Sequence, residues 1–271
     1  MPASPATPRS TLLAFNTVER LLRGDYFHSV ALDELTAALA DFPSCWPVCG
    51  IGTTNWYRRN GEVIVDGSAG RPAIWWADPG ASPAAKVVDL LRDARVEDLH
   101  LTSPSMAEDG SEARLPFVAV GVADPDLRVE VRVPAGADLH AAVAERCADA
   151  NVGLAAVRAS LVAAVDYQTV CHLPLGGAAS LDDAEAVRGS AASQPWVLAG
   201  VYACNPTVQA ITSVAGSSLH LHGYSDASHV GGHVRAATPV AVSTVEVFPL
   251  RDVVLRIRDL DSAVLPVRPL R

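Results

Sequence analysis

The segment RVPAGADLHAAVAERCADANVGLAAV, residues 132–157, carries the signals of a strand, a turn, a helix and a second strand in that order. Asp138 suits a helix N-cap, and apolar residues follow it at helical spacing as far as Cys147. Asn151 and Gly153 are residue types that commonly end a helix. The segment therefore predicts a helix packed beside strands, as in an α+β protein.

Two further helices are expected. One has Ser82 as its N-cap and Pro83 in its first turn, and its apolar residues recur at helical spacing up to Ala94. The other covers Leu32–Ala40, where the apolar residues would face inward.

Short runs rich in β-branched residues predict strands between and after these helices. They cover residues 61–66, 115–122, 127–133, 197–202, 218–224 and 240–248. Two stretches, residues 104–114 and 174–195, are acidic, contain small residues and lack periodicity, which is typical of surface loops. The expected class is α+β, with two lobes of mixed β-sheet and packed helices.

A faint repeat supports the two lobes. LDELTAALADFPSCWPVCGIGT (residues 32–53) resembles LHAAVAERCADANVGLAAVRAS (residues 139–160), and each is a helix that leads into a strand. We therefore expect a possible internal duplication, with an N-terminal α+β lobe over residues 1–124 and a second lobe over residues 125–271.

Composition limits the classes of function. A chain of 271 residues with 49% hydrophobic residues can form a sizeable core without disulfides. Its five cysteines are scattered and lack paired metal-ligand spacing, so we expect a reducing, cytoplasmic setting. MPASPATPRS does not resemble a signal peptide, and no apolar run approaches the ~20 residues that span a bilayer. A net charge of -9 without a basic cluster argues against nucleic-acid binding.

The segment SSLHLHGYSDASHVGGHV, residues 217–234, holds a histidine pattern with chemical meaning. His220 and His222 are two apart in an apolar run, so on a strand both imidazoles project from one face. The residues that follow favour a chain reversal, which would bring His233 back on an adjacent antiparallel strand. Three ring nitrogens would then converge.

Three histidines predict a divalent-metal site, with Zn²⁺ as the expected ion. Neutral imidazole suits zinc, and three protein ligands with a vacant fourth position are typical of catalytic zinc. Gly231 and Gly232 would let a substrate or strand approach closely. His229 has two open roles, a lid residue or a fourth ligand. The alternative is that the histidines are ordinary hydrogen-bonded residues.

Residues 127–265 resemble the plant-and-prokaryote-conserved (PPC) domain. The similarity begins in RVPAGADLHAAVAERCADANVGLAAV and continues through LHLHGYSDASHVGGHV, TVEVFPL and LRIRDLD. That domain shares its fold with α-acetolactate decarboxylases, two-lobed zinc enzymes whose ligands come from an H-x-H strand and a following G-G-H. The resemblance implies His220, His222 and His233 as the metal ligands.

The first half is similar to the N-terminal lobe of those decarboxylases in LLRGDY, LDEL, GIGT and NGEVIVDG. LPFVAV followed by VEVRVP resembles the segment with their active-site arginine. The resemblance implies that Glu62 is a catalytic acid and that Arg132 anchors a substrate carboxylate. The decarboxylases have another functional glutamate in a C-terminal extension without a counterpart here, so acetolactate itself is not the expected substrate.

Other candidate residues lie near the C-terminus. Glu246 has apolar neighbours on an expected inner strand, so its carboxylate needs a partner, for which a metal-bound water, a histidine N–H and Arg258 are the candidates. Tyr224, His229 and Arg258 are the expected substrate contacts. Glu62 and Glu246 could each be an ordinary solvated or paired acid instead.

We expect a metal-dependent lyase that cleaves a small oxo or hydroxy acid through an enediolate, by decarboxylation or a related reaction. Two alternatives stay open. One is a zinc-dependent ester or lactone hydrolase, because an open zinc can also ionise water. The other is a non-catalytic PPC-type module that oligomerises or regulates. The expected partners are a small-molecule substrate and further copies of the chain, in a dimer or trimer, without nucleic acid or membrane.

Overall fold

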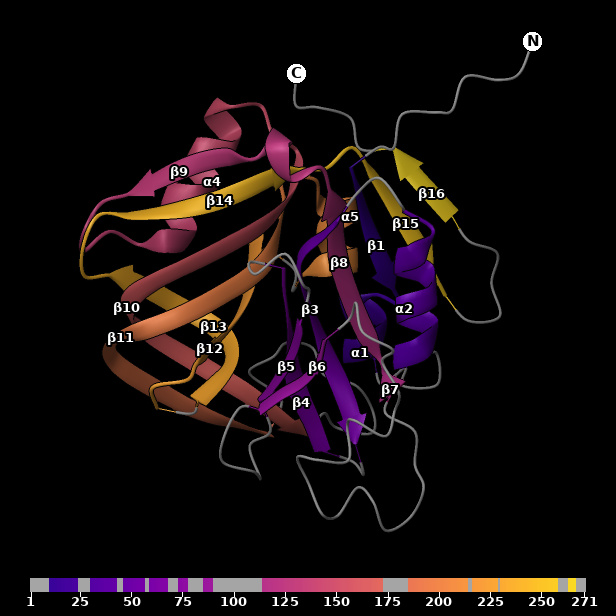
Figure 1. Ribbon diagram of the computed structural model, residues 1–271, viewed down its shortest axis with the longest axis horizontal. Coiled ribbons are helices and arrows are strands. Elements are labelled where there is room, and N and C mark those ends of the chain that lie inside the picture. The colour runs from indigo at the N-terminus through magenta and orange to yellow at the C-terminus, as the bar shows by residue number, and fades with distance from the viewer. Residues whose placement is uncertain are drawn as a thin grey trace.

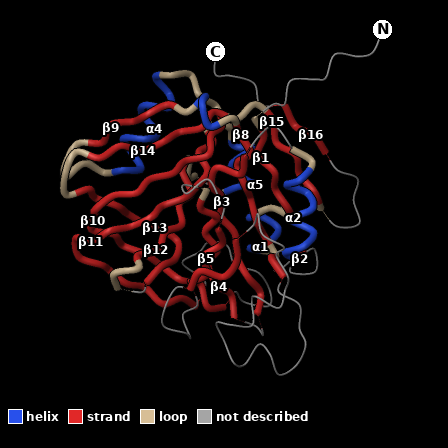
Figure 2. Tube along the Cα trace, viewed as in Figure 1, coloured by secondary structure: helices blue, strands red, loops and turns tan. Residues whose placement is uncertain are grey.

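Two large β-sheets pack against each other, with helices around them (Figures 1 and 2). The chain is represented by a computed structural model. It describes residues 10–23, 30–42, 46–56, 59–67, 73–77, 85–89, 114–172, 185–213, 216–228, 230–257 and 263–266. The mixed sheets and few helices confirm the expected α+β class.

The first sheet has eight strands in the order β16-β15-β1-β8-β3-β4-β5-β6. These are β1 (Thr11–Phe15), β3 (Trp46–Trp56), β4 (Arg59–Asp66), β5 (Ala73–Ala77), β6 (Ala85–Asp89), β8 (Phe117–Ala123), β15 (Asp252–Arg256) and β16 (Ala263–Pro266). β1 and β15 pair in parallel, whereas the other pairs are antiparallel. A separate pair consists of β2 (Val30–Ala31) and β7 (Arg114–Leu115).

The second sheet has six strands in the order β11-β12-β13-β10-β14-β9. These are β9 (Val129–Val133), β10 (Leu154–His172), β11 (Glu185–Ala203), β12 (Leu219–Ser225), β13 (Val230–Pro239) and β14 (Ser243–Pro249). β10 also pairs with β11, so β10, β11, β12 and β13 close into a ring.

The two halves share a strand order. β1-β8-β3-β4-β5-β6 in the first sheet corresponds, in chain order and antiparallel pairing, to β9-β14-β10-β11-β12-β13 in the second. An internal duplication would produce this correspondence. The boundary expected at residue 124 falls between β8 and β9, but β15 and β16 return to the first sheet.

Two helices occupy equivalent places and agree with the sequence. α2 (Leu32–Ala40) packs on the first sheet and α4 (Leu139–Asp149) on the second. The Asp138 side chain accepts a hydrogen bond from the Ala141 N–H at 2.8 Å and caps α4. Asn151 has a φ of 55°, which suits the chain reversal after the helix. Both expected helices are confirmed.

Two short helices were not predicted from the sequence. They are α1 (Val18–Leu22) and α5 (Pro206–Thr212), which touch each other at the edge of the core between the sheets. Neither is long enough for a clear helical period to emerge in the sequence. A 3₁₀ turn, η2 (Pro125–Leu127), precedes β9.

The expected helix from Ser82 to Ala94 is wrong where the structure describes it. Ala85–Asp89 is strand β6, which pairs with β5 at the edge of the first sheet. Val87 and Val88 are β-branched and fit a strand, and the edge of β5 supplies backbone partners that a local helical pattern cannot reveal.

The expected loop over residues 174–195 is wrong in its second part. Strand β11 begins at Glu185, and residues 185–195 pair with β10. Polar and small residues can form a strand here because the backbone of β10 supplies a continuous row of hydrogen-bond partners. Residues 174–184 lie outside the described residues, as do all residues of the other expected loop except Arg114.

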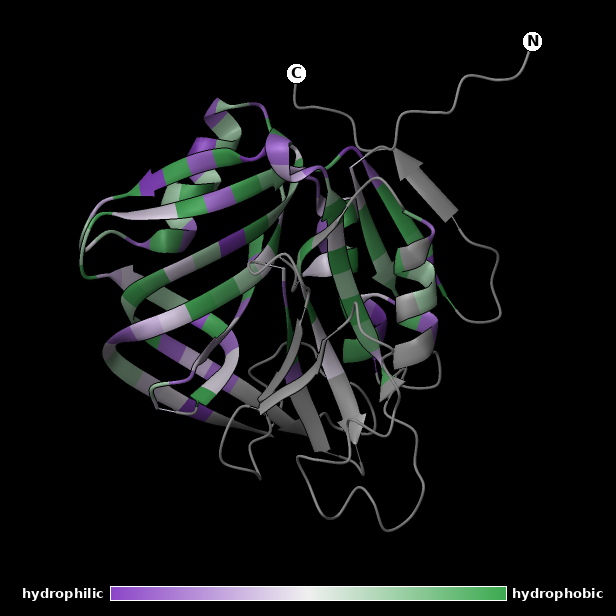
Figure 3. Ribbon diagram, viewed as in Figure 1, coloured by the Kyte–Doolittle hydropathy of each residue, from purple (hydrophilic) through white to green (hydrophobic). Residues whose placement is uncertain are grey.

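The main core lies between the two sheets. Leu12, Ile51 and Phe117 of the first sheet share it with Ala156 and Val201 of the second. Hydrophobic residues run along β1 and β8 in the first layer (Figure 3). A Cβ atom on Gly121 would lie 2.3 Å from the Ala156 Cβ, so the sheets approach too closely there for a side chain. Among the described residues, the helices are too short or too polar to cross a membrane.

Candidate metal centre

Strand β12 presents two histidines to the first sheet. His220, His222 and Tyr224 alternate with Leu219 and Leu221, which pack into the core on the α4 side. This is the period of two expected for a strand. The side chains of His220 and His222 are almost completely buried.

Strand β13 brings the third histidine to the same place. A turn at residues 226–228 reverses the chain, and the Cα atoms of His222 and His233 are partners in the antiparallel ladder. Gly232 has a φ of 153°, a value that side-chain-bearing residues rarely adopt. The convergence of the three histidines is the arrangement expected from their spacing.

The three rings form a compact cluster, which we call the histidine cluster (His220, His222 and His233). Their centroids are 4.8 Å apart for His220–His222 and for His220–His233, and 5.7 Å apart for His222–His233. One nitrogen of each ring lies within 4.8 Å of the other two. The His220 and His222 Nε2 atoms are 3.0 Å apart.

Hydrogen bonds fix which nitrogen of each β12 histidine carries the proton. The His220 Nδ1–H donates to the Thr212 carbonyl oxygen at 2.6 Å, and the His222 Nδ1–H donates to the Val63 carbonyl oxygen at 3.0 Å. A carbonyl can only accept, so in the neutral rings both Nε2 atoms keep their lone pairs. Val63 belongs to β4, so the first sheet orients a histidine of the second.

Glu62, the neighbour of Val63 on β4, places a carboxylate beside the histidines. Its Oε2 lies 3.3 Å from the His222 Nε2, and the side chain is buried. The residue implied by resemblance as the acid is therefore brought to the histidine cluster, from the opposite sheet. The His222 Nε2 thus lies 3.3 Å from the Glu62 Oε2 and 3.0 Å from the His220 Nε2.

Burial keeps the imidazoles neutral. It lowers the pKa of His220 to about 4, although the hydrogen bond to the Thr212 carbonyl acts in the opposite direction. Burial, with the neighbouring His220, also holds the pKa values of His222 and His233 well below the usual value. Neutral imidazole is the form that binds metal ions.

The donor atoms fit a divalent cation. Facing lone pairs only 3.0 Å apart repel each other unless a positive group lies between them, whereas two nitrogen ligands of a tetrahedral zinc are about 3.3 Å apart. Within the described part of the chain, the buried His233 Nδ1 has no hydrogen-bond partner. Nitrogen and carboxylate oxygen donors suit Zn²⁺ and related ions.

Tyr224 lies beside the cluster but is held by an acid. Its hydroxyl donates to Asp66 Oδ2 at 3.3 Å, and both side chains are buried. Asp66 and Glu62 project from the same face of β4, since they are four residues apart. The Tyr224–Asp66 pair is therefore a second polar contact between β12 and β4, beside the one between His222 and Glu62.

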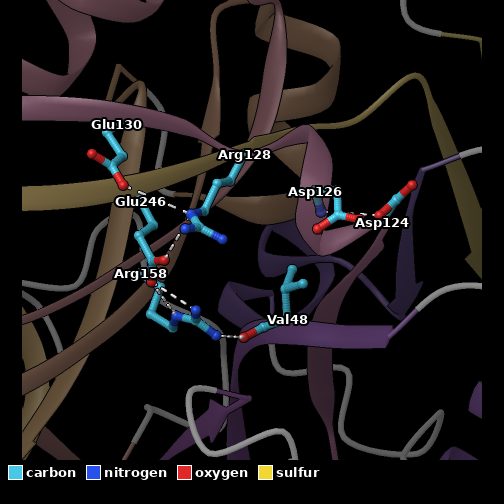
Figure 4. A network of polar contacts seen from close by, with 7 residues as sticks. All are labelled: Val48, Asp124, Asp126, Arg128, Glu130, Arg158 and Glu246. Atoms are coloured by element: carbon cyan, nitrogen blue, oxygen red, sulfur yellow. Dashed lines mark hydrogen bonds and ion pairs between the residues drawn. The ribbon is translucent and has the colours of Figure 1, made fainter.

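Glu246 has a partner that the sequence did not predict. Its Oε2 accepts hydrogen bonds from Arg158 at 2.7 Å, and its Oε1 lies 3.5 Å from the Arg128 Nε (Figure 4). Arg158 also donates to the Val48 carbonyl oxygen of β3 at 3.3 Å. Glu246 thus belongs to an ion-pair network that joins the sheets.

The structure does not bring Arg132 to the histidine cluster. Arg132 is exposed on β9, the edge strand, and β14 and β10 lie between β9 and β13. Two strands therefore separate Arg132 from the strand that carries His233. His229 and Arg258, the other expected contacts, lie outside the described residues.

Two residues beside the cluster, Gln168 and Arg235, were not among the site residues predicted from the sequence. Gln168 of β10 is the ladder partner of His233, and its Oε1 accepts a hydrogen bond from the Arg235 Nη1 at 2.8 Å. Arg235 follows His233 by two residues, but its contact with Gln168 depends on the register between β10 and β13, which the sequence alone does not show.

Comparisons with known proteins place the fold. α-Acetolactate decarboxylase from Bacillus subtilis strain 168 aligns over 93% of this chain and 90% of its own, with 18% identity and a TM-score of 0.65. The enzyme from Bacillus subtilis subspecies spizizenii aligns over 93% and 91%, with 17% identity and a TM-score of 0.63. The resemblance in fold expected from the sequence is confirmed.

Two other solved structures are similar to different degrees. A Staphylococcus aureus protein of unknown function, described as similar to α-acetolactate decarboxylase, covers 91% of this chain and 88% of its own, at 14% identity and a TM-score of 0.62. A PPC protein from Pyrococcus horikoshii covers 53% of this chain and 92% of its own, at 12% identity and a TM-score of 0.33. No protein-family model and no curated protein matches the sequence.

Proposed function

We propose that the protein is a zinc-dependent lyase that cleaves a small oxo or hydroxy acid, by decarboxylation or a related reaction. The observation that carries this proposal is the meeting of three imidazoles, two of them buried, with the Glu62 carboxylate, whose Oε2 is 3.3 Å from the His222 Nε2. The fold shared with α-acetolactate decarboxylases supports it.

The histidine cluster would hold the metal. When bound, a divalent cation polarises a substrate carbonyl and stabilises negative charge that develops on oxygen. The backbone carbonyls of Thr212 and Val63 fix the orientation of the His220 and His222 rings, so that their Nε2 atoms point to a common centre.

Glu62 would donate the proton that the reaction requires. After a carbon–carbon bond breaks, the carbon that held the departing group needs a proton, and a carboxylic acid next to the cluster can donate it. The buried position of Glu62 keeps bulk water from supplying that proton instead. A hydrolase remains the second candidate, because the same carboxylate could take a proton from an attacking water.

The test begins with the metal content of the purified protein, measured by elemental spectrometry, and continues with a panel of oxo and hydroxy acids, esters and lactones. Released carbon dioxide from an acid supports the lyase. Incorporation of oxygen from ¹⁸O-labelled water into an ester product supports the hydrolase. Protein without metal, inactive on the whole panel, would contradict both and favour the non-catalytic module.

The proposed setting is a cytoplasmic homo-oligomer that acts on small molecules. This part of the proposal rests on composition and on the resemblance to PPC domains. Light scattering coupled to size-exclusion chromatography measures the oligomeric state, and a monomer at working concentration would contradict it.

A further inference from the structure

We infer that the outer edge of β9 pairs with the same edge of a second copy of this chain, in an antiparallel dimer with two-fold symmetry. The dimer rests on the proposed homo-oligomer and gives it an interface, but it does not depend on the proposed reaction. Glu130 and Arg132, exposed on this edge strand, carry the inference.

Strand β9 forms the margin of the second sheet (Figure 1). Within the described residues, β14 pairs with one side of β9, and no strand pairs with the other side. The backbone N–H and C=O groups on an unpaired side can form a ladder with a strand of another chain. Two copies joined in this way share one continuous sheet.

The two faces of β9 differ, which limits how a second copy can join. Val131 and Val133 are buried in the core that α4 covers, whereas Glu130 and Arg132 are exposed on the opposite face. The apolar face of one copy must continue the apolar face of the other. A two-fold axis perpendicular to the sheet does this, and it makes the paired strands antiparallel.

One register pairs opposite charges along the whole strand. An axis at Val131 places Glu130 opposite Arg132 of the second copy, and Arg132 opposite Glu130 of that copy. Val129 then faces Val133 of the second copy, so the ladder uses all five residues of β9. Opposite charges in facing positions stabilise a pair of strands.

Other registers are less favourable. An axis at Glu130 or at Arg132 places like charges opposite each other, which destabilises the pair. An axis at Val129 sets the end of β9 against the 3₁₀ turn η2 of the second copy. A shift by a single residue brings opposite faces together. The charges therefore select the axis at Val131.

Both charged side chains are accessible for this pairing. Within the described part of the chain, Arg132 forms no hydrogen bond or ion pair. The Glu130 side chain is 60% exposed, and its Oε1 lies 3.8 Å from the Arg128 Nε, at the outer end of the network in Figure 4. That distance is too long for a hydrogen bond, so the carboxylate can turn to a second copy.

Apolar residues at the two ends of β9 also match in this register. Leu127, which precedes the strand, is 56% exposed. Pro134 and Ala135, which follow it, are exposed as well. The axis at Val131 places Leu127 of one copy opposite Ala135 of the other, at both ends of the ladder. Contact there removes apolar surface from water and favours association.

The ion pairs set the register rather than the strength of the dimer. Exposed ion pairs contribute little to affinity but determine which partners and alignments are allowed. Backbone hydrogen bonds and the cover over Leu127 supply the affinity. A five-residue edge is a small interface, so we expect a weak and reversible dimer.

The experiment exchanges the charges and measures association. Sedimentation equilibrium gives the dimer dissociation constant of wild type, Glu130→Arg, Arg132→Glu and the double variant Glu130→Arg/Arg132→Glu, and of an equal mixture of the two single variants. Asp226→Arg is the matched control, because Asp226 is exposed in the turn after β12, which three strands separate from β9. Circular dichroism and thermal unfolding check that each variant folds.

We expect each single variant to raise the dissociation constant roughly tenfold or more, because both ion pairs become contacts between like charges. The mixture and the double variant restore opposite charges, so both should dimerise within roughly threefold of wild type, as should Asp226→Arg. General repulsion between chains of net charge -9 predicts the reverse for Glu130→Arg, which makes the chain less acidic.

A monomeric wild type would overturn the inference, as would a dimer whose dissociation constant is the same in the single variants. Failure of the mixture and of the double variant to recover would also overturn it. A dimer that binds no zinc and is inactive on the whole panel would refute the proposed reaction alone. Metal analysis therefore distinguishes the two failures.

Discussion

The two halves of the molecule share a strand order and differ in chemistry. β12, with the sequence LHLHGYS, is the counterpart of β5, with the sequence AIWWA, so the strand that carries two of the histidines corresponds to a strand without histidine. Within the described residues, histidines converge only in the second half, although both halves share the strand order. The fold supplies the positions, and local residues supply the chemistry.

The comparison also shows that the site belongs to neither half alone. The imidazoles come from β12 and β13, whereas the Glu62 carboxylate and the Val63 carbonyl come from β4. Packing of the two sheets therefore brings the proposed acid to the proposed ligands. The predictions below separate what each half contributes.

Removal of a ligand from the second half should have the largest effect. We expect His222→Ala to lose stoichiometric metal and all measurable turnover while it stays folded, because two imidazoles rarely retain zinc. Elemental spectrometry and circular dichroism measure the two properties. His140→Ala, which removes a histidine outside the cluster, should keep its metal. Unchanged metal in His222→Ala would refute the assignment.

Removal of the acid from the first half should affect turnover but not metal. Glu62→Gln should keep its zinc and lose about 10²–10⁴-fold in kcat, the usual contribution of a general acid or base. Kinetics on the substrate found in the panel, with metal analysis, checks this. Glu130→Gln is the control, because Glu130 is exposed on β9. If Glu62→Gln loses its metal, the carboxylate is a ligand instead.

Disruption of the contact between the halves should lower stability alone. Arg158→Ala leaves Glu246 without its nearest partner and removes the bond to Val48, so we expect a loss of about 1–3 kcal/mol in the free energy of unfolding. Urea unfolding measures it. Arg128→Ala should cost less than about 1 kcal/mol, since that side chain is 46% exposed. Equal losses would contradict the proposed importance of Arg158.

The smallest effect concerns the equivalent helices. Asp138→Ala removes the N-cap of α4 and should cost about 1 kcal/mol. In α2 the N-cap is Ala31, and the Glu34 Oε2 accepts from its N–H at 2.8 Å instead. We expect Glu34→Ala to cost less, which thermal or urea unfolding of both variants can compare. The reverse order would show that α2 depends more on its cap.

Local patterns allowed part of this structure to be predicted. Asp138 and the following apolar spacing predicted α4, and the alternation around His220 and His222 predicted β12. The helix predicted over residues 85–89 was wrong, because these residues pair with the backbone of β5 and form a strand. The spacing of apolar residues within one segment does not show whether a neighbouring strand is available for pairing.

The candidate site shows the same limit. The spacing of the three histidines was enough to predict that they converge. Glu62 was predicted only from the resemblance to the decarboxylases, because its neighbour His222 is distant in sequence. Arg132 was chosen by resemblance and lies on the edge strand. Arg235 depends on a bulge and on the register between β10 and β13, and neither can be read from the residues themselves.

The parallel pairing of β1 with β15 has a consequence for biosynthesis. A ribosome makes β1 long before β15, so one edge of nascent β1 stays unpaired while the strands between them emerge. Unpaired strand edges attract other chains. The first sheet is thus completed after the second, although six of its eight strands precede the second sheet in the sequence.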